Sequence, residues 1–418
     1  MQLETILNRV EKNKSFVYRN ARWTTAPSGP PQLEVTILPR ANSRPICSGC
    51  RQTGPGYDHL PARRFEFVPL WQIPVFFVYA LRRVNCANCG VTAEQVPWCQ
   101  GKQTQTRTYQ WFLAFWARRL SWQETARVFG TSWQRVFQAV KYAVMWGIAH
   151  DEWRDVHTLG VDEIAWRKGH SYLTMVYQLD EGRKRLLWMS PNREKKTLEK
   201  FFDCLGKEQA QRVKFVCSDM WGAYVKVIAK RAKDAVHVLD RFHIMKLMNK
   251  GIDEVRRGEV KQLERDGYEP ILKHSRWCLL KRRENRTKGQ TVKLKELLQY
   301  NLQSVKAHLS REDFQQFWEY KSATWAGKFL DEWCTRVMRT RLEPMKKVAR
   351  TLRKHRELIL NWFKADGLLS AGTVEGFNNK AKLTLRKAYG FRSPETAQIA
   401  LYHTLSDLPT PKFTHEFW

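Results

Sequence analysis

Two aspartates stand where their side chains can do chemistry together. Asp162 lies near the end of the apolar run HTLGVDEI, and Asp219 ends the run VKFVCSD. Both runs have the composition of β-strands, the first and fourth of a predicted strand-rich region. If these strands are neighbours in a sheet, the two carboxylates lie side by side at one edge. Adjacent carboxylates repel each other unless divalent cations lie between them, and two Mg²⁺ or Mn²⁺ ions on oxygen ligands can serve phosphodiester cleavage.

Such a site needs a third carboxylate, and Glu375 is the candidate. It lies in the segment AGTVEGFNNKAKLTLRKAYGF, in the first turn of a predicted helix that follows a break in the pattern. The alternative role of Glu375 is to stabilise the helix N-terminus by its charge. Glu163 follows Asp162 on the same strand, so its side chain is expected on the opposite face of the sheet.

The elements expected around these acids form a mixed α/β sheet. Three consecutive strands after Val156 are followed by a helix, a fourth strand, another helix and a fifth strand. This order predicts a mixed sheet with helices on its faces. A helical stretch rich in Lys and Arg then runs from Arg241 to about Ala365, before the segment DGLLSAG interrupts the pattern.

Four cysteines in two CxxC pairs are spaced as metal ligands. Two such knuckles can present four thiolates tetrahedrally to one Zn²⁺ ion, and a closed four-ligand site is structural. The interval between the pairs is longer than in a usual zinc ribbon, so Cys99 and His59 are spare ligands, and four buried free cysteines are the alternative. The expected ligands are Cys47, Cys50, Cys86 and Cys89.

The segment RLSWQETARVFGTSWQRVFQAVKYAV predicts two short helices joined by a turn. Ser121 and Glu124 form a capping box, Gly130 supplies the turn, and Thr131 or Ser132 can cap the second helix. This pattern fits a helix-turn-helix that reads the major groove of DNA, and it also fits an ordinary helical hairpin with a solvated polar face. The core face of the second helix is expected to hold Trp133, Val136, Phe137 and Val140. The outward, DNA-reading face is expected to hold Gln134, Arg135, Gln138 and Lys141.

The composition favours a polyanionic partner. The 418 residues include 72 Lys and Arg against 41 Asp and Glu, a net charge of +31. This excess is self-repelling unless a polyanion neutralises it, so nucleic acid is the leading partner. An anionic membrane is the rival, but the sequence has no run of about 18 uncharged apolar residues. The N-terminal segment MQLETILNRV has an acidic residue where a secretory signal would need basic ones, so a cytoplasmic protein is expected.

Together these motifs resemble the bacterial insertion-sequence transposases of the ISL-three family, which carry a ribonuclease-H-like catalytic domain with an Asp-Asp-Glu triad. The resemblance covers nearly the whole chain: the CxxC pairs, the helix-turn-helix, and then GVDE, CSDMWGAY, LDRFH and TVEGFNNKAKLTLRKAYGF in this order. It implies that Asp162, Asp219 and Glu375 are catalytic and bind two Mg²⁺ or Mn²⁺ ions. It also implies DNA cleavage and strand transfer on double-stranded element ends and target DNA, by a homodimer or larger assembly.

Basic residues near the acids are further candidates for DNA contacts. His243, in LDRFH, is expected either to contact a substrate phosphate or to be structural. Lys380, Lys382 and Arg386 recur along the last helix, and phosphate contact is favoured over a solvated basic face. Two rival functions share these features. One is a DNA-binding regulator with a zinc finger and a helix-turn-helix, and the other is a purely hydrolytic ribonuclease-H-like nuclease.

The predicted fold class is α/β, a ribonuclease-H-like mixed sheet with helices on both faces, joined to an all-α insertion, a helix-turn-helix and an N-terminal zinc-binding domain. An N-terminal helix and a linker with the loop-like text TTAPSGPPQ are expected to come first. The catalytic core is expected in two parts around the insertion. The predicted boundaries are 1–40 for helix and linker, 41–104 for zinc binding, 105–150 for the helix-turn-helix, 151–240 and 367–418 for the core, and 241–366 for the insertion.

Overall fold

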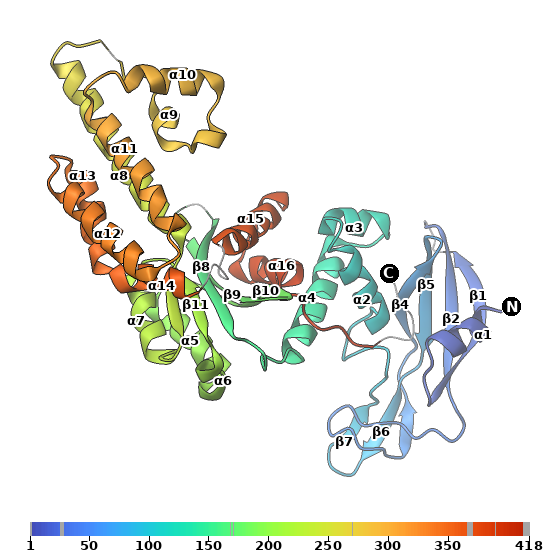
Figure 1. The fold of residues 1–418 in the computed structure, drawn as a ribbon. Coiled ribbons are helices and arrows are strands. Elements are labelled where there is room, and N and C mark those ends of the chain that lie inside the picture. The colour runs from blue at the N-terminus through green and yellow to red at the C-terminus, as the bar shows by residue number, and fades with distance from the viewer. Residues whose placement is uncertain are drawn as a thin grey trace. The chain divides into compact units, whose positions relative to one another are not determined.

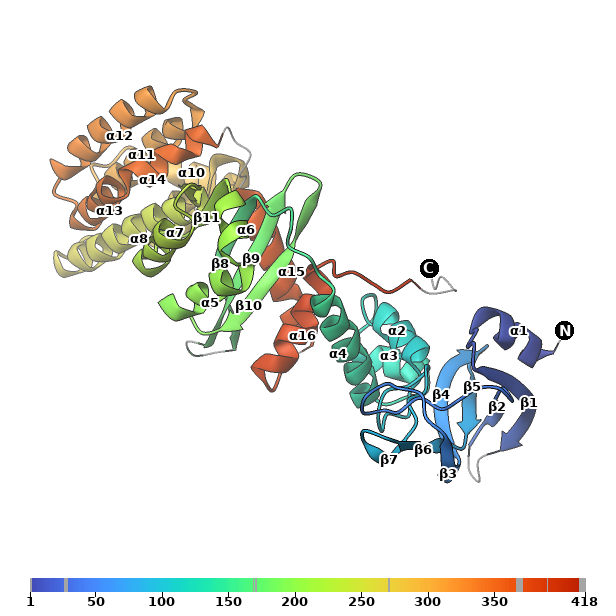
Figure 2. The same cartoon turned by 90° about the horizontal axis from the view of Figure 1, so that it is seen from below.

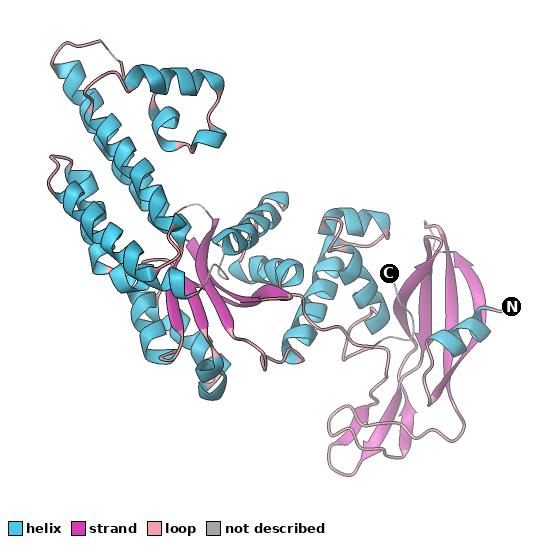
Figure 3. Ribbon diagram, viewed as in Figure 1, coloured by secondary structure: helices cyan, strands magenta, loops and turns pink. Residues whose placement is uncertain are grey.

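The computed structural model describes residues 2–25, 29–167, 169, 171–269, 271–365, 371–388 and 390–412. Parts of the predicted loop TTAPSGPPQ and of the predicted break DGLLSAG lie outside the described residues. The chain divides into two compact units, whose secondary structure is shown in Figure 1 and Figure 3. Unit 1 comprises residues 1–152 and 384–418, and unit 2 comprises residues 153–383.

Unit 1 begins with the short helix α1 (Leu3–Val10) and a four-stranded sheet of order β1-β2-β5-β4. Strand β2 pairs with β1 in antiparallel fashion and with β5 in parallel. The linker prediction was therefore wrong for Thr24, Thr25, Pro31 and Gln32, which belong to strands. A proline is tolerated as the first residue of a strand, and the sequence pattern could not show this pairing. The bounds are β1 (Phe16–Thr25), β2 (Pro31–Pro39), β4 (Arg63–Leu70) and β5 (Ile73–Tyr79).

A smaller sheet of order β3-β6-β7 carries the cysteine pairs. Glu94, whose side chain is 1% exposed, connects this sheet to the larger one. It lies 2.8 Å from the guanidinium of Arg82 in the smaller sheet and accepts a hydrogen bond from Tyr79 in the larger sheet. A buried carboxylate with this many donors holds the connection rigidly. The bounds are β3 (Gly56–His59), β6 (Arg82–Cys86) and β7 (Gly90–Ala93).

The predicted pair of helices with an intervening turn is present in unit 1. Ser121 and Glu124 form the capping box, Gly130 has φ +61° in the turn, and Ser132 caps the second helix. Val136 and Val140 are buried as predicted. The C-terminal helix α16 packs against α4. The bounds are α2 (Arg107–Trp116), α3 (Trp122–Val128), α4 (Trp133–Ala149) and α16 (Pro394–Leu405).

Trp133 corrects one prediction about this helix pair, because it is 49% exposed and does not belong to the core. It is the first residue of α4. Helical periodicity identifies which face of a helix is apolar, but it does not show how far neighbouring helices cover that face. Phe137, one turn further on, is half-buried against Trp122.

Unit 2 contains a five-stranded mixed sheet of order β10-β9-β8-β11-β12. Strands β8, β9 and β10 are antiparallel, and β11 runs parallel to both β8 and β12. The mixed α/β sheet and the pairing of its first and fourth strands are thereby confirmed. The bounds are β8 (Thr158–Arg167), β9 (Ser171–Asp180), β10 (Arg183–Pro191), β11 (Phe215–Ser218) and β12 (Val236–Leu239).

Helices cover both faces of this sheet. On one face Val176 and Leu198 share a core with Tyr224, and on the other Tyr177 stacks on Phe377 at 5.0 Å between ring centroids. Residues 176 and 177 are neighbours on one strand and must face opposite ways. The helices involved are α5 (Lys195–Leu205), α6 (Lys207–Arg212), α7 (Gly222–Arg231) and α15 (Ala371–Lys387).

The stretch between β12 and α15 is helical throughout its described elements, as predicted. The long helix α8 and α11 run side by side in both Figure 1 and Figure 2, over a core around Trp333 and Phe314. Within the described ranges, no helix is both long and apolar enough to span a membrane. The bounds are α8 (Arg241–Arg265), α9 (Arg276–Leu280), η1 (Arg283–Asn285), α10 (Lys288–Leu297), α11 (Gln303–Gln315), η2 (Gln316–Glu319), α12 (Ala323–Met338), α13 (Glu343–Lys354) and α14 (Arg356–Lys364).

Candidate active site and metal centre

The parallel pairing of strands aligns three aspartates at one edge of the sheet in unit 2. The register pairs Cys217 of β11 with Gly160 of β8 and with Val238 of β12. Asp219 and Asp240 each follow the last residue of their strand, and the N–H of Asp240 donates to the carbonyl oxygen of Ser218 at 2.9 Å. Continued by two residues, the register of β8 and β11 would set Asp219 level with Asp162. All three aspartates are at least nine-tenths buried.

Asp162 is held by donors from three elements. Its Oδ1 atom accepts a hydrogen bond from the backbone N–H of Glu163 at 2.7 Å, and its Oδ2 atom accepts one from the side-chain amide of Asn378. His243 Nε2 lies 3.8 Å from Oδ1. Burial alone would raise the pKa of Asp162, but His243 and these donors outweigh it and lower the pKa. The carboxylate is therefore kept ionised and fixed in direction.

Asp219 is held by a backbone N–H and a cation. Its Oδ1 atom accepts from the N–H of Trp221 at 2.9 Å, and its Oδ2 atom lies 2.8 Å from Nη2 of Arg193. The same guanidinium places Nε 2.8 Å from Oε1 of Glu163. Burial and the negative charge of Asp219 raise the pKa of Glu163 to about 7. Glu163 also interacts with Tyr224 of α7, on the face opposite Tyr177.

Asp240 and His243 begin the helix that follows β12. Asp240 caps α8 by accepting from the N–H of Phe242 at 2.8 Å, and His243 Nε2 lies 3.9 Å from its Oδ2 atom. Burial raises the pKa of Asp240 to about 6, and the charges of Asp162 and Glu375 contribute to this rise. Burial disfavours the imidazolium form of His243, but the adjacent Asp162 outweighs it and raises the pKa of His243.

Glu375 is exposed on α15, which packs on the strand that carries Asp162. A Cβ atom at Gly160 would lie 3.0 Å from Val374 and 2.8 Å from Leu179, so this glycine permits the close approach of the helix. Glu375 and Asn378 are three residues apart, and such residues share one face of a helix. The negative charge of Glu375 contributes to the raised pKa of Asp240, so the two carboxylates are close enough to interact electrostatically.

The three predicted acids do not form a closed cluster. Across the part of the chain that is described, the only group of three or more His, Cys, Asp or Glu side chains with ligand atoms within 4.8 Å of one another consists of cysteines. A two-ion site spaces its ions about 3.5–4 Å apart, so its carboxylates need not all touch. The residues thus fit a pair of hard cations in donor type, with Asp162 and Asp219 set by the sheet and Glu375 brought by a helix.

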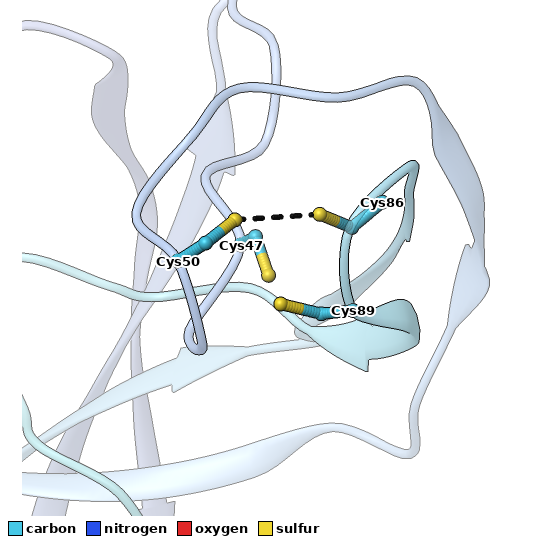
Figure 4. A group of neighbouring side chains, drawn as sticks. All are labelled: Cys47, Cys50, Cys86 and Cys89. Carbon is cyan, nitrogen blue, oxygen red and sulfur yellow. Dashed lines mark hydrogen bonds between the residues drawn. The ribbon is translucent and has the colours of Figure 1, made fainter.

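The four predicted cysteines converge in unit 1, as Figure 4 shows. Their sulfur atoms all lie within 4.8 Å of one another, and Sγ of Cys50 lies 3.4 Å from Sγ of Cys86. Four thiolates at this spacing fit the tetrahedral coordination of Zn²⁺. A Cβ atom at residue 49 would lie 3.0 Å from Sγ of Cys89, so Gly49 leaves room for the cluster. The spare ligand Cys99 lies elsewhere and donates to the carbonyl oxygen of Gln103.

The thiols of this cluster differ in acidity. A hydrogen bond with Thr92 is the main cause that lowers the pKa of Cys47 to about 6. Hydrogen bonding to Cys50, followed by burial, raises the pKa of Cys89 to about 12. Crowded thiols resist ionising together in this way, and a bound cation removes the resistance.

The predicted DNA-reading residues of α4 have unequal surroundings. Gln134 and Gln138 are exposed. Arg135 lies 2.8 Å from Glu66, and Lys141 lies 2.6 Å from Glu395, so both cations are engaged in ion pairs. The basic residues predicted on the last helix are all exposed; they are Lys380, Lys382 and Arg386.

Two side chains at the acid site were not predicted as site residues. Asn378 lies in the same quoted segment as Glu375 but was not singled out, although it contacts Asp162 directly. Arg193 lies in the turn after β10 and contacts both Glu163 and Asp219. The one available signal for Asn378 was its spacing of three residues from Glu375, whereas nothing in the sequence around Arg193 distinguishes it from other basic residues.

This chain is similar to known transposases. The profile of the ISL3 (ISL-three) family of DDE transposases, described as "Transposase", matches residues 159–401. The transposase for insertion sequence element IS1001 of Bordetella parapertussis is 30% identical over 366 residues, covering 87% of this chain and 89% of that protein. The transposase for insertion sequence element IS1557 of Mycobacterium tuberculosis is 28% identical over 391 residues, covering 87% of this chain and 86% of that protein. The chain belongs to the ISL3 family and has the function of a DNA transposase.

Proposed function

We propose that this transposase cleaves and joins DNA with Asp162, Asp219 and Glu375, on a sheet of the ribonuclease-H type and with two Mg²⁺ or Mn²⁺ ions. The observation that carries the proposal is the parallel register of β8 and β11, which pairs Cys217 with Gly160, two residues before Asp219 and Asp162. The packing of α15 at Gly160 supports the third acid, because it brings the helix of Glu375 onto the same strand.

The protein's own residues fix the acids before any reaction. Asn378 and the Glu163 N–H orient Asp162, and Trp221 orients Asp219. When bound, the ions would neutralise the carboxylates, activate a water or hydroxyl oxygen and stabilise the leaving oxygen of the phosphodiester. His243, whose Nε2 atom lies 3.8 Å from Oδ1 of Asp162, is proposed to contact a substrate phosphate. Both cleavage and joining are in-line displacements at phosphorus, so one set of acids serves both steps without a covalent protein intermediate.

Unit 1 is proposed to recognise the ends of the element. The four cysteines would hold one structural Zn²⁺ ion. Helix α4 would then present Gln134 and Gln138 to base edges, and Arg135 and Lys141 would exchange Glu66 and Glu395 for phosphates. Lys380, Lys382 and Arg386 are proposed to contact DNA backbone beside the acids. The predicted boundaries remain the proposed assignment of roles along the chain, with two exceptions. Strands β1 and β2 lie where a linker was predicted, and residues 384–418 belong to unit 1.

The working assembly is proposed to be at least a homodimer, with one protomer for each element end. Its place is then the bacterial cytoplasm, with the nucleoid, because both substrates are double-stranded DNA. Size measurement of the full chain with and without a duplex that carries an element end tests the assembly. A monomer on DNA at all protein concentrations would contradict it.

Strand transfer in vitro tests the chemistry. The full chain is incubated with a labelled element end, a target plasmid and Mg²⁺, and joined products are counted. Asp219→Ala is expected to abolish joining while it preserves DNA binding. Appreciable joining by this variant would remove Asp219 from the mechanism. Cleavage without any joining by the wild type would instead identify a hydrolytic nuclease, and function without divalent metal would identify a DNA-binding regulator.

A further inference from the structure

The guanidinium of Arg193 lies directly between the carboxylates of Glu163 and Asp219. Arg193 follows the edge strand β10 and reaches the level of Asp219, with Nη2 2.8 Å from Oδ2 of Asp219 and Nε 2.8 Å from Oε1 of Glu163. Its guanidinium also lies over the ring of Trp221, 4.7 Å from the centroid. The positive charge is thus held where a metal ion would otherwise balance the two carboxylates.

We propose that Arg193 is an internal counter-ion that occupies Asp219 until a DNA phosphate draws it away, and that it thereby couples DNA binding to metal binding. This inference rests on the proposed function, because it takes Asp219 as a metal ligand. It assigns to Arg193 a positioning role that neither the sequence motifs nor the family match assign.

The two aspartates differ in a way that supports this role. Both oxygens of Asp219 accept hydrogen bonds, Oδ1 from the N–H of Trp221 and Oδ2 from Arg193. Of these two donors only Arg193 carries a charge. Two cations a few ångströms apart repel each other strongly in a partly buried site, so a divalent ion and Arg193 compete for Oδ2. Asp162, in contrast, accepts hydrogen bonds from the uncharged donors Glu163 N–H and Asn378, and the ring of His243 lies further away, 3.8 Å from its Oδ1 atom.

Arg193 is also able to leave. Its side chain is 36% exposed, whereas those of Glu163 and Asp219 are 8% and 10% exposed. A guanidinium binds phosphate oxygens through two parallel N–H groups, which makes a DNA phosphate a suitable new partner. Because coupling between two binding events is reciprocal, DNA that removes Arg193 must tighten metal binding, and metal must tighten DNA binding.

Binding of Mn²⁺ to the full chain, measured by the electron paramagnetic resonance of free Mn²⁺, tests the proposal without any turnover. For the wild type, a duplex with an element end is expected to tighten Mn²⁺ binding by about tenfold or more. For Arg193→Gln, Mn²⁺ is expected to bind tightly without DNA, and the duplex is expected to add little. Lys195→Gln is the matched control, because Lys195 pairs with Glu199 and loses the same charge two residues away.

Two further variants locate the effect. Arg193→Lys keeps the charge and is expected to keep most of the dependence on DNA. Adding Asp219→Asn to Arg193→Gln is expected to remove the gained Mn²⁺ affinity. An Arg193→Gln protein that is folded by circular dichroism and binds Mn²⁺ like the wild type overturns the coupling alone. Absence of Mn²⁺ binding in every variant, with and without DNA, overturns the proposed metal-dependent function as well.

A cluster of arginines in the helical segment offers an independent anion site. Arg241 begins α8, Arg282 and Arg286 flank η1, and Arg311 lies on α11. The side chains of Arg286 and Arg311 are only 7% and 2% exposed. Within the described part of the chain, Nη2 of Arg286 and Nε of both Arg241 and Arg311 are buried without a hydrogen-bond partner.

Glu312 balances only part of this positive charge: it accepts a hydrogen bond from Arg311 and lies 3.9 Å from Nη2 of Arg286. Burial, followed by the charge of Arg282, lowers the pKa of Arg241. Burial also lowers the pKa of Arg311. Glu312 raises this pKa, whereas the charges of Arg286 and Arg282 lower it further. Arg311 is nevertheless held in place, because it donates to Asn249 at 2.8 Å and to the carbonyl oxygen of Leu280 at 2.7 Å. Buried guanidinium N–H groups without partners are costly unless an anion satisfies them.

We infer that this cluster binds a phosphate of the DNA backbone, apart from the acid site. The test is the affinity of the full chain for a fluorescent duplex as a function of salt. Loss of one phosphate contact lowers the salt slope by about one, so Arg282→Gln and, separately, Arg286→Gln are expected to show this decrease. Lys226→Gln, an exposed lysine of α7, is the charge-matched control. Slopes for both arginine variants equal to that of the control overturn the inference.

Discussion

The side-chain amide of Asn378 donates a hydrogen bond to Oδ2 of Asp162, so a helix from the end of the chain holds a carboxylate of the first strand of the sheet. The direction of this amide is itself fixed. The hydroxyl of Tyr177 donates to Oδ1 of Asn378 at 2.9 Å, which leaves the NH₂ group as the side that faces the carboxylate. A reversed amide would place two oxygens against each other. Tyr177 and Asn378 therefore act together to orient Asp162.

Replacement of Asn378 by Ala is expected to weaken metal binding. Partners that orient a metal ligand typically contribute about 10- to 100-fold in affinity, so Mn²⁺ affinity with DNA present should fall within that range. Tyr177→Phe should give a smaller loss, since it removes one hydrogen bond worth about 1 kcal/mol. Asn379→Ala, at the exposed neighbouring position, is the control. Equal Mn²⁺ affinities for Asn378→Ala and Asn379→Ala would show that the amide does not orient the site.

Gly160 determines how closely α15 approaches the sheet. A methyl group there would lie 2.8 Å from Leu179 and 3.0 Å from Val374, so Gly160→Ala should cost about 1–3 kcal/mol by overpacking. Amide hydrogen exchange along α15 should become faster, because the helix is displaced from β8. Gly222→Ala is the matched change, since a Cβ atom at Gly222 meets nothing within 4 Å. Unchanged exchange in α15 of the Gly160 variant would contradict this account of the packing.

Features of the site that depend on local sequence patterns could be predicted, whereas contacts between side chains far apart in the sequence could not. The pairing of β8 with β11 was predictable, because strand order follows from the succession of elements. The position of Asp162 was not, since it lies within β8 (Thr158–Arg167) and not near the end of the strand as predicted. The cysteine cluster was predictable from local spacing. The contact of Asn378 with Asp162 was not, since it depends on how one helix is rotated over the sheet. Arg193 was not predictable either, because a turn residue has no periodicity that shows where its side chain reaches.

Local patterns also failed at the edges of elements. Trp133 was placed in the core by helical periodicity, yet it is the first residue of α4 and is half exposed. The proline- and threonine-rich text near residue 30 indicated a loop, although Thr24, Thr25, Pro31 and Gln32 belong to paired strands. In both cases the structure of the residue depends on the element that covers it or pairs with it. That element is either distant in the sequence or has no recognisable sequence pattern.

The zinc content of the protein should depend on the four clustered cysteines and on no other cysteine. The wild-type chain is expected to retain one zinc ion, measured by atomic absorption after dialysis. Cys86→Ser should lose it, and the thermal transition of unit 1 should fall because a structural zinc contributes directly to folding. Cys99→Ser is the control, since Cys99 is buried outside the cluster and donates to Gln103. Zinc retained by Cys86→Ser or lost by Cys99→Ser would mean that the ligand set is assigned wrongly.

His403 should make unit 1 sensitive to acid. Burial on α16, followed by the charge of Arg118, lowers the pKa of His403 from 6.5 to about 3. The unfolded chain therefore binds a proton at this histidine before the folded chain does. The resulting stability is complete above about pH 6.5 and is lost as the pH falls toward 3, by about 2 kcal/mol at about pH 5.

The variant His403→Gln separates this effect from the titration of carboxylates, because a glutamine does not titrate. Its thermal unfolding midpoint at neutral pH is expected to fall, since a well-packed buried side chain is replaced. Between about pH 6.5 and pH 4, however, its midpoint should decline less steeply than that of the wild type, because one depressed pKa has been removed from the folded state. Scanning calorimetry of both proteins across this range is the measurement. Parallel declines would mean that His403 is protonated in the folded protein, and the buried histidine would then require an unrecognised anionic partner.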